Sequence, residues 1–195
     1  MEVSQVQELR QQMAATGWAP IPLVTNDKAV KIANWSNLAR QDSTYFAQQP
    51  ARADMLNTGF LCDGLRVVDI DIDDREYVGH VARLAAKWLG DRPLVRKRSN
   101  SERLALVYRA AEGAPVKVVV NGKRGKVEIL GRGQQLHAFG LHPSGVEPQW
   151  VIGFQNNRAA RITELQWVDP TGSNPEQRFP QIEKRPKQLG LLDLV

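Results

Sequence analysis

The chain has 195 residues, of which 42% are hydrophobic and 24% are charged, and its formal net charge is +5 with an isoelectric point near 9.6. This composition is typical of a globular domain and excludes a disordered or fibrous chain. The single cysteine, Cys62, excludes an internal disulfide bond, and no apolar stretch approaches the roughly 18 residues of a membrane span. We therefore expect one cytoplasmic domain without membrane association, and its basic charge favours phosphate-rich partners.

The first quarter of the chain predicts two helices with an extended segment between them. Apolar residues recur at helical spacing over residues 3–15, and Gly17 ends this pattern. Prolines punctuate residues 18–24, which predict an edge strand leading to Lys28. A short helix is expected at about residues 43–49, with Asp42 or Ser43 as its cap.

Two strands are predicted at residues 57–62 and 65–73, and Asp63-Gly64 between them favours a hairpin that pairs them. Successive strand side chains point to opposite faces of a sheet, so the second strand has two different faces. One face carries Val68, Ile70 and Ile72, and the other carries Asp69, Asp71 and Asp73. The pattern indicates a strand with one buried face and one carboxylate-lined face.

The rest of the chain predicts one long helix and a run of strands. The helix covers residues 74–89 and ends before Gly90, and its apolar face comprises Tyr77, Val81, Leu84, Ala85 and Trp88. Strands are expected at residues 94–98, 103–109, 116–120, 126–130 and 135–139. Asn121-Gly122 indicates a type I′ turn.

Helices in the first half and strands in the second predict an α+β, or mixed α/β, fold. The domain is expected to span residues 1–168. A linker rich in proline, glutamine and charge then follows at residues 169–195, leading towards a further C-terminal region.

The aspartate strand carries the first chemical signal. Asp69, Asp71 and Asp73 repel one another, and a bound cation removes that repulsion. Carboxylate oxygens suit Mg²⁺ or Mn²⁺.

Glu128 lies mid-strand in KVEILGRG, just before a glycine-rich turn. If the two strands are neighbours, Asp69, Asp71 and Glu128 converge on one or two metal ions, as in-line displacement at phosphorus requires. The alternative is a solvated strand face with ordinary surface acids.

A basic cluster lies between these acids along the chain, in LVRKRSNSERLALVYR. Arg96 and Arg98 share a strand face, and Arg103 begins the return strand after a turn that ends at Ser101. Guanidinium groups and the N–H groups of such a turn suit a phosphate. In isolation the segment is more typical of a solvated basic hairpin, but beside a metal site it favours triphosphate binding.

The segment GRGQQLHAFGLHPSG combines glycines, which permit close backbone approach, with polar side chains. His137 and His142 are five residues apart without cysteine partners, so a zinc site is not expected. His142 either contacts a nucleotide or makes a structural hydrogen bond within its own turn.

Taken together, these motifs resemble the bifunctional primase-polymerase domain of the archaeo-eukaryotic primase superfamily, in the form encoded by phages, prophages and plasmids. The likeness covers about residues 17–150 and rests on Lys28 and Trp35, on NTGFLC-DGLRVVDIDID, on VEILGRGQQ, and on a His-Pro followed by Trp150. It implies an RRM-like catalytic sheet with an N-terminal α/β lobe. It also implies template-directed nucleotidyl transfer with Mg²⁺ or Mn²⁺, and a helicase that is fused or acts in trans.

The resemblance implies that Asp69 and Asp71 form the first metal-binding motif and that Glu128 is the acid of the third. Ser101-Glu102-Arg103 occupies the place of the second motif, where many members carry a histidine that contacts the incoming nucleotide. An arginine holds a phosphate but does not act as a neutral acid or base. The partners are then a single-stranded DNA template and an NTP or dNTP, and the expected nucleotide contacts are Lys28, Arg96, Arg98, Ser101, Arg103 and His142.

Two other functions fit parts of the sequence. A metal-dependent nuclease also uses paired acids followed by a strand acid, although Lys126-Val-Glu128 does not have the Glu-x-Lys order that such enzymes often use. A non-catalytic single-stranded-DNA-binding module of a replication initiator would stack bases on Trp35, Tyr108 or Trp150 and would need no metal.

Overall fold

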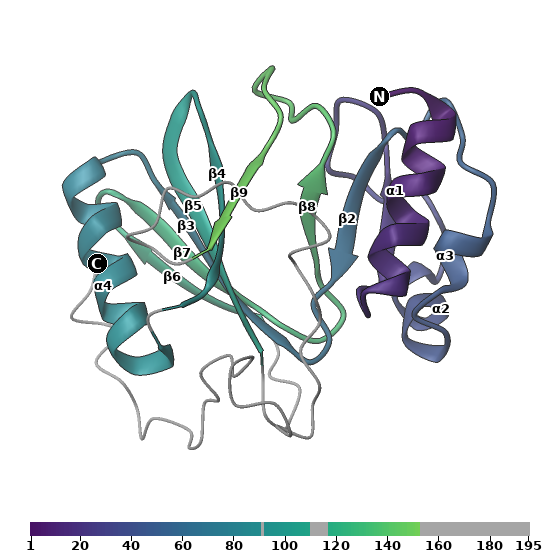
Figure 1. Cartoon of the computed structure of the whole chain (residues 1–195). Coiled ribbons are helices and arrows are strands. Elements are labelled where there is room, and N and C mark those ends of the chain that lie inside the picture. The colour runs from purple at the N-terminus through teal and green to yellow at the C-terminus, as the bar shows by residue number, and fades with distance from the viewer. Residues whose placement is uncertain (91, 110–116, 153–195) are drawn as a thin grey trace. The chain divides into compact units, whose positions relative to one another are not determined.

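The computed structural model describes residues 1–90, 92–109 and 117–152. These residues form four helices and nine strands, which belong to two compact units (Figure 1). Unit 1 comprises Met1–Asp63 and Gly133–Pro148, and unit 2 comprises Gly64–Arg132 and residues 149–152. The predicted α+β class is confirmed. The linker predicted at residues 169–195 lies outside the described residues.

Unit 1 contains a three-stranded antiparallel sheet in the order β1 (Pro20–Leu23), β2 (Asn57–Leu61) and β8 (Gln135–Phe139). Its core is made by Ile21, Leu23, Ala39, Phe46 and Leu61. Three helices pack around this sheet, namely α1 (Val3–Ala15), α2 (Trp35–Gln41) and α3 (Tyr45–Gln48).

Among these helices, α1 has the predicted bounds and α3 is shorter than predicted. The sequence did not predict α2. This helix has seven residues, and its N-cap, Asn34, has a left-handed backbone and makes no side-chain cap hydrogen bond. The sequence of α2 therefore has neither the long apolar periodicity nor the capping motif from which a helix is predicted.

Arg10 is the largest fully buried side chain of the protein's described part, with 2% of its surface exposed. Its guanidinium donates hydrogen bonds to the backbone oxygens of Met55 and Asn57, at 2.6 and 3.1 Å, and to Oγ1 of Thr58, at 3.1 Å. Burial lowers the pKa of Arg10 to about 10 because the charged form loses its hydration. Arg10 thus ties α1 to β2 and to the segment before it.

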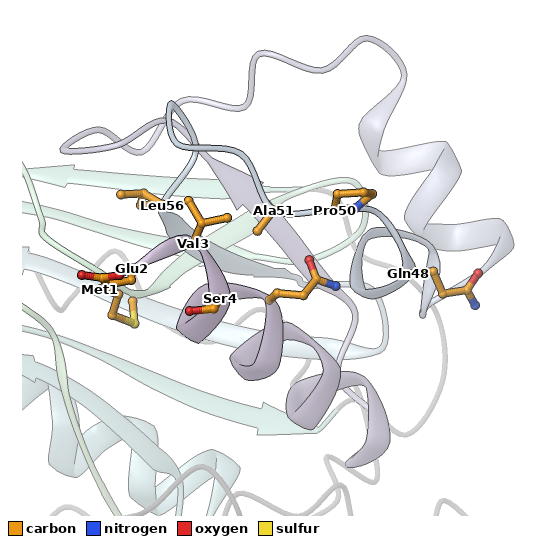
Figure 2. Close-up of a pocket in the computed structure, with 9 residues that line it drawn as sticks. Met1, Glu2, Val3, Ser4, Gln48, Pro50, Ala51 and Leu56 are labelled. Atoms are coloured by element: carbon orange, nitrogen blue, oxygen red, sulfur yellow. The ribbon is translucent and has the colours of Figure 1, made fainter.

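A hollow of about 940 Å³ opens beside the start of α1 in unit 1. Figure 2 shows residues of the first turn of α1 facing the end of α3, where Gln48 is labelled, and the segment after it, where Pro50 and Ala51 are labelled. Glu2 is the only carboxylate in its lining. The hollow therefore lacks the grouped ionisable side chains that catalysis needs.

Unit 2 contains a six-stranded sheet whose neighbouring strands are all antiparallel. Its order is β6 (Val118–Gly122), β7 (Gly125–Leu130), β3 (Leu65–Ile72), β5 (Ser101–Arg109), β4 (Leu94–Arg98) and β9 (Gln149–Ile152). The four central strands have the order β7-β3-β5-β4, and β6 and β9 form the two edges.

Helix α4 (Arg75–Leu89) covers one face of this sheet (Figure 1). It packs on the alternate apolar residues of β3, namely Val68, Ile70 and Ile72. The opposite face is left for the aspartates, as the alternation predicted. No helix of the described residues combines the length and the apolar character that crossing a membrane requires.

The predicted pairing of the strands at residues 57–62 and 65–73 is wrong. Strand β2 pairs with β1 and β8, whereas β3 pairs with β5 and β7, so the two strands belong to different sheets. Gly64 does have the left-handed φ of 73° that favours glycine in a turn. Asp63, however, accepts hydrogen bonds from Gly133 N and Arg40 Nε, both at 2.7 Å, and so holds unit 1 together.

Two further details differ from the prediction. The turn between β6 and β7 is formed by Lys123 and Arg124, because Gly122 pairs with Gly125, so the Asn121-Gly122 turn is wrong by two residues. On α4, Trp88 is 52% exposed, and the fully buried positions are Val78, Val81 and Ala82. The buried face of α4 is therefore centred on Val78, Val81 and Ala82, and the prediction that Trp88 belongs to it is wrong.

Candidate metal centre and its basic surroundings

Strands β3 and β7 bring the predicted acids together. They pair so that Asp69 lies opposite Glu128 and Asp71 lies opposite Lys126. Because directly opposite residues of an antiparallel pair point to the same face, Asp69, Asp71 and Glu128 share the face away from α4. One carboxylate oxygen from each lies within 4.8 Å of those of the other two. We call Asp69, Asp71 and Glu128 the carboxylate triad.

Two members of the triad, Asp69 and Glu128, belong to a row of side chains that crosses the whole sheet. In register, this row is Val119, Glu128, Asp69, Ala105, Arg96 and Trp150. Ala105, fully buried on β5, separates Asp69 from Arg96 with only a methyl group. The Arg96 Nη2 atom can therefore reach across to within 3.2 Å of Asp69 Oδ1. The row places a guanidinium on one side of the triad.

Two lysines contact the triad from the other side. Lys117 Nζ lies 2.6 Å from Glu128 Oε1, and Lys126 Nζ lies 3.2 Å from Glu128 Oε2. Burial by itself raises the pKa of Glu128, but the hydrogen bonds and charges of the two lysines outweigh it and hold that pKa below its ordinary value. Glu128 is therefore ionised at neutral pH and accepts charge-assisted hydrogen bonds on both oxygens.

Asp73 has the same face as the other two aspartates but different neighbours. It follows the last residue of β3 and its side chain is 63% exposed. Arg103 donates to both of its oxygens, Nε to Oδ1 at 2.9 Å and Nη2 to Oδ2 at 2.7 Å, and Ser101 Oγ lies 3.3 Å from Oδ1. The hydrogen bonds from Arg103 hold the pKa of Asp73 below its ordinary value. Asp73 thus orients an arginine and lies outside the carboxylate triad.

The basic strands form a hairpin, as predicted, in which Ser99 and Asn100 make the turn and Arg98 pairs with Ser101. Arg103 Nη1 lies 3.8 Å from Asp71 Oδ1. Burial lowers the pKa of Arg98, and the positive charges of Arg96 and Arg103 lower it further. The guanidinium groups of Arg96, Arg98 and Arg103 lie beside the triad and repel one another. A bound anion would reduce this repulsion, so the position favours anion binding.

Lys28 and His142, the other predicted nucleotide contacts, belong to unit 1. Lys28 is exposed in the loop after β1, and its backbone oxygen accepts a hydrogen bond from Gln135 Nε2 at 3.0 Å. His142 is buried, and its Nδ1 atom accepts a hydrogen bond from the backbone N–H of Ser144 at 3.0 Å. A structural hydrogen bond within the turn, one of the two roles that the sequence left open for His142, is therefore present and uses Nδ1 of its ring.

The carboxylate triad fits a divalent cation of the Mg²⁺ type. All of its donor atoms are oxygens, and Mg²⁺ holds oxygens at about 2.1 Å in octahedral geometry, so two oxygens that share one ion lie between about 3.0 and 4.2 Å apart. The triad oxygens, within 4.8 Å of one another, need only small side-chain movements to reach that spacing. The ammonium groups of Lys117 and Lys126 lie against these oxygens.

Sequence reasoning missed the lysines. Lys126 precedes Glu128 by two positions on a strand, so the alternation itself places both side chains on one face. Lys117 carries no such signal, because its contact with Glu128 depends on the pairing of β6 with β7.

Comparison with known proteins agrees with this geometry. No curated protein matches the chain. The model of a protein family, described as bifunctional DNA primase/polymerase, N-terminal, matches residues 10–169. The matched region contains the carboxylate triad, the basic hairpin and all nine strands of the described residues. The chain belongs to the family of bifunctional DNA primase/polymerase N-terminal domains.

Proposed function

We propose that this chain is a metal-dependent primase-polymerase domain that adds nucleotides to a 3′-hydroxyl on a single-stranded DNA template. The observation that carries the proposal is the pairing of Asp69 with Glu128 across β3 and β7, which forms the carboxylate triad in a chain of this family. Oxygen ligands grouped on one face of a sheet and bordered by arginines suit a nucleoside triphosphate with its metal ion.

In this proposal Asp69, Asp71 and Glu128 hold one or two Mg²⁺ or Mn²⁺ ions. Bound there, such ions would lower the pKa of the attacking hydroxyl and neutralise charge on the leaving pyrophosphate. The three carboxylates fix the reacting groups on a rigid sheet, because Asp69 and Asp71 lie on a central strand with partners on both sides. Small positional errors are costly in such reactions, so a central strand is a favourable support.

Arg96, Arg98 and Arg103 hold the triphosphate in this mechanism. Arg103 is presented by Asp73 with its Nη1 atom towards Asp71, and Ser101 Oγ accepts a hydrogen bond from its backbone N–H at 3.1 Å. An arginine remains charged throughout, so it neutralises phosphate oxygens and does not relay a proton. Lys28 and His142 are proposed as further nucleotide contacts.

We also propose the domain organisation and the biological setting of the chain. Residues 1–168 act as the catalytic domain in the cytoplasm, residues 169–195 lead to a helicase region that is fused or supplied in trans, and the protein replicates a phage, prophage or plasmid. Both NTPs and dNTPs are candidate substrates.

A primer-extension assay tests the proposal. Labelled primed template is incubated with Mn²⁺ and dNTPs or NTPs, and the wild-type chain is expected to lengthen the primer, whereas Asp69→Asn is expected to abolish extension and to retain the thermal unfolding midpoint. Asp54→Asn is the matched control, since Asp54 is an exposed acid of unit 1 paired with Arg52. Wild-type extension by Asp69→Asn contradicts the metal assignment.

The same assay separates the two other functions. Shortening of the labelled strand indicates a metal-dependent nuclease. Tight binding of single-stranded DNA in EDTA, together with no incorporation under any metal, indicates a binding module of a replication initiator.

A further inference from the structure

Lys126 occupies an unusual position in the proposed metal centre. Its Nζ atom lies 3.2 Å from Glu128 Oε2 and 3.5 Å from Asp71 Oδ2, so one ammonium group bridges two carboxylates of the triad. Lys126 is also the register partner of Asp71 on β7. Its side chain therefore rises from the same face of the sheet as the acids that it contacts.

The charges around the triad explain why an ammonium group is held there. Three carboxylates whose oxygens approach within 4.8 Å repel one another, and the side chain of Glu128 is only 11% exposed, so water screens it poorly. The hydrogen bond to Glu128, with the charges of Glu128 and Asp71, raises the pKa of Lys126 above its ordinary value. The ammonium form is thus stabilised by the acids, and the acids are stabilised by it.

We infer that Lys126 is a built-in counter-ion of the metal centre, which holds Asp71 and Glu128 together in the metal-free protein and leaves their oxygens when a divalent cation binds. The inference rests on the proposed metal centre, because it assigns Asp71 and Glu128 as ligands. A divalent ion and the ammonium group both bind through the carboxylates of Asp71 and Glu128, and both carry positive charge. They therefore compete.

The competition between Lys126 and the divalent ion predicts the direction in which a substitution of Lys126 changes metal affinity. Replacing Lys126 by methionine keeps the aliphatic stem and removes the charge. The metal then has no Lys126 ammonium group to displace, and Lys117, Arg96 and Arg103 offset only part of the repulsion among the acids, so the metal binds more tightly. A side chain that merely supported the strand would act in the opposite direction, because its loss would loosen the acids and weaken metal binding.

The test measures Mn²⁺ affinity by calorimetry or by electron paramagnetic resonance, without nucleotide, in the full chain at low salt. Lys126→Met is expected to bind Mn²⁺ at least about fivefold more tightly than the wild type, which is the factor for two unit charges about 4 Å apart in a water-like medium and is raised further by the double charge of Mn²⁺. Lys126→Arg keeps the charge and is expected to show no such gain. Lys123→Met is the matched control, since Lys123 is exposed in the turn of the same hairpin.

The outcomes separate this inference from the proposed function. Equal Mn²⁺ affinity in the wild type and Lys126→Met, or weaker binding by the variant, overturns the counter-ion role and leaves the metal centre standing. An equal gain in Lys123→Met also overturns it, because a general charge effect would then explain the result. Absence of Mn²⁺ binding in a folded wild-type chain overturns the metal centre itself. Unfolding midpoints with and without Mn²⁺ give a second readout, in which the rise caused by Mn²⁺ is larger for Lys126→Met.

Discussion

In unit 1, buried polar side chains bond to backbone atoms that are distant along the chain, whereas the polar face of unit 2 carries charged side chains that are paired with one another. Arg10 and Asn57 hold loops in unit 1, and Asn57 Nδ2 donates to the backbone oxygens of Asp27 and Leu141 at 2.9 and 2.7 Å. In unit 2, the carboxylate triad contacts arginines and lysines at the edge of solvent.

Polar residues that look alike in the sequence therefore have two different roles, one in stabilising the fold and one in binding a ligand. A buried side chain whose partners are backbone atoms cannot exchange them without exposing unsatisfied groups, so it stabilises the fold. Charged side chains that are paired with one another near solvent can exchange a partner for a ligand. We therefore expect polar substitutions in unit 1 to change stability and those in unit 2 to change activity.

The largest expected effect is on catalysis by Glu128→Gln. This variant keeps the shape of the side chain and removes one charge of the triad, and we expect kcat/KM for nucleotide incorporation to fall at least about a hundredfold, since even groups that only support metal ligands often cost that much. Glu102→Gln, an exposed acid on β5, is the control and is expected to retain activity. If Glu128→Gln lowered the free energy of unfolding but kept normal activity, Glu128 would have the stabilising role that we assign to the polar residues of unit 1.

The next effect is on stability in unit 1. Arg10→Met removes three hydrogen bonds to buried acceptors, and we expect the free energy of unfolding to fall by about 2–4 kcal/mol in urea titrations. Arg52→Met, which removes an exposed ion pair, is expected to change the free energy of unfolding much less, because solvent screens this pair. Equal costs for the two variants would show that the buried network of Arg10 adds no stability.

A smaller effect is expected from Gly140→Ala. Gly140 has a φ of 93°, and a methyl group there would meet both the side chain and the backbone of Asn57. We expect a cost of about 2–3 kcal/mol, because strain and the clash add. Gly145→Ala separates these two causes, since Gly145 has a φ of 85° with nothing within 4 Å, and it should cost about 1 kcal/mol. Thermal or urea unfolding of the two variants gives the difference.

The smallest effect concerns pH and Asp73. Its folded-state pKa lies below the ordinary value of 3.8, because Arg103 donates hydrogen bonds to it. This contribution to stability is fully present above pH 3.8 and is lost as the pH falls through the lowered pKa. Between pH 5 and pH 3 the urea midpoint of the wild type should therefore fall slightly more than that of Asp73→Asn. The same fall in both chains would show that the pair with Arg103 adds nothing.

Local patterns predicted much of the fold but not its pairings. The strands at residues 94–98 and 135–139 have the predicted bounds, because their neighbours end them clearly. Asp63-Gly64 favours a turn, but turn chemistry does not say that β5 and β7 take both edges of β3.

The candidate site shows the same limit. Alternation along single strands identified Asp69, Asp71 and Glu128. The separate role of Asp73 depends on Arg103 across the sheet, and the contact of Lys117 depends on β6, so neither follows from one strand alone.

The path of the chain has a consequence for biosynthesis. Strand β8 completes the sheet of unit 1 but follows β3 to β7 in the sequence. During translation β2 can pair with β1 early, while its other edge stays open until the ribosome has released β8. Strands β3 to β7 are contiguous and can pair in the meantime. A chain shortened before residue 133 would keep that open edge permanently, and exposed strand edges invite aggregation. Unit 1 therefore cannot be isolated by simple C-terminal deletion.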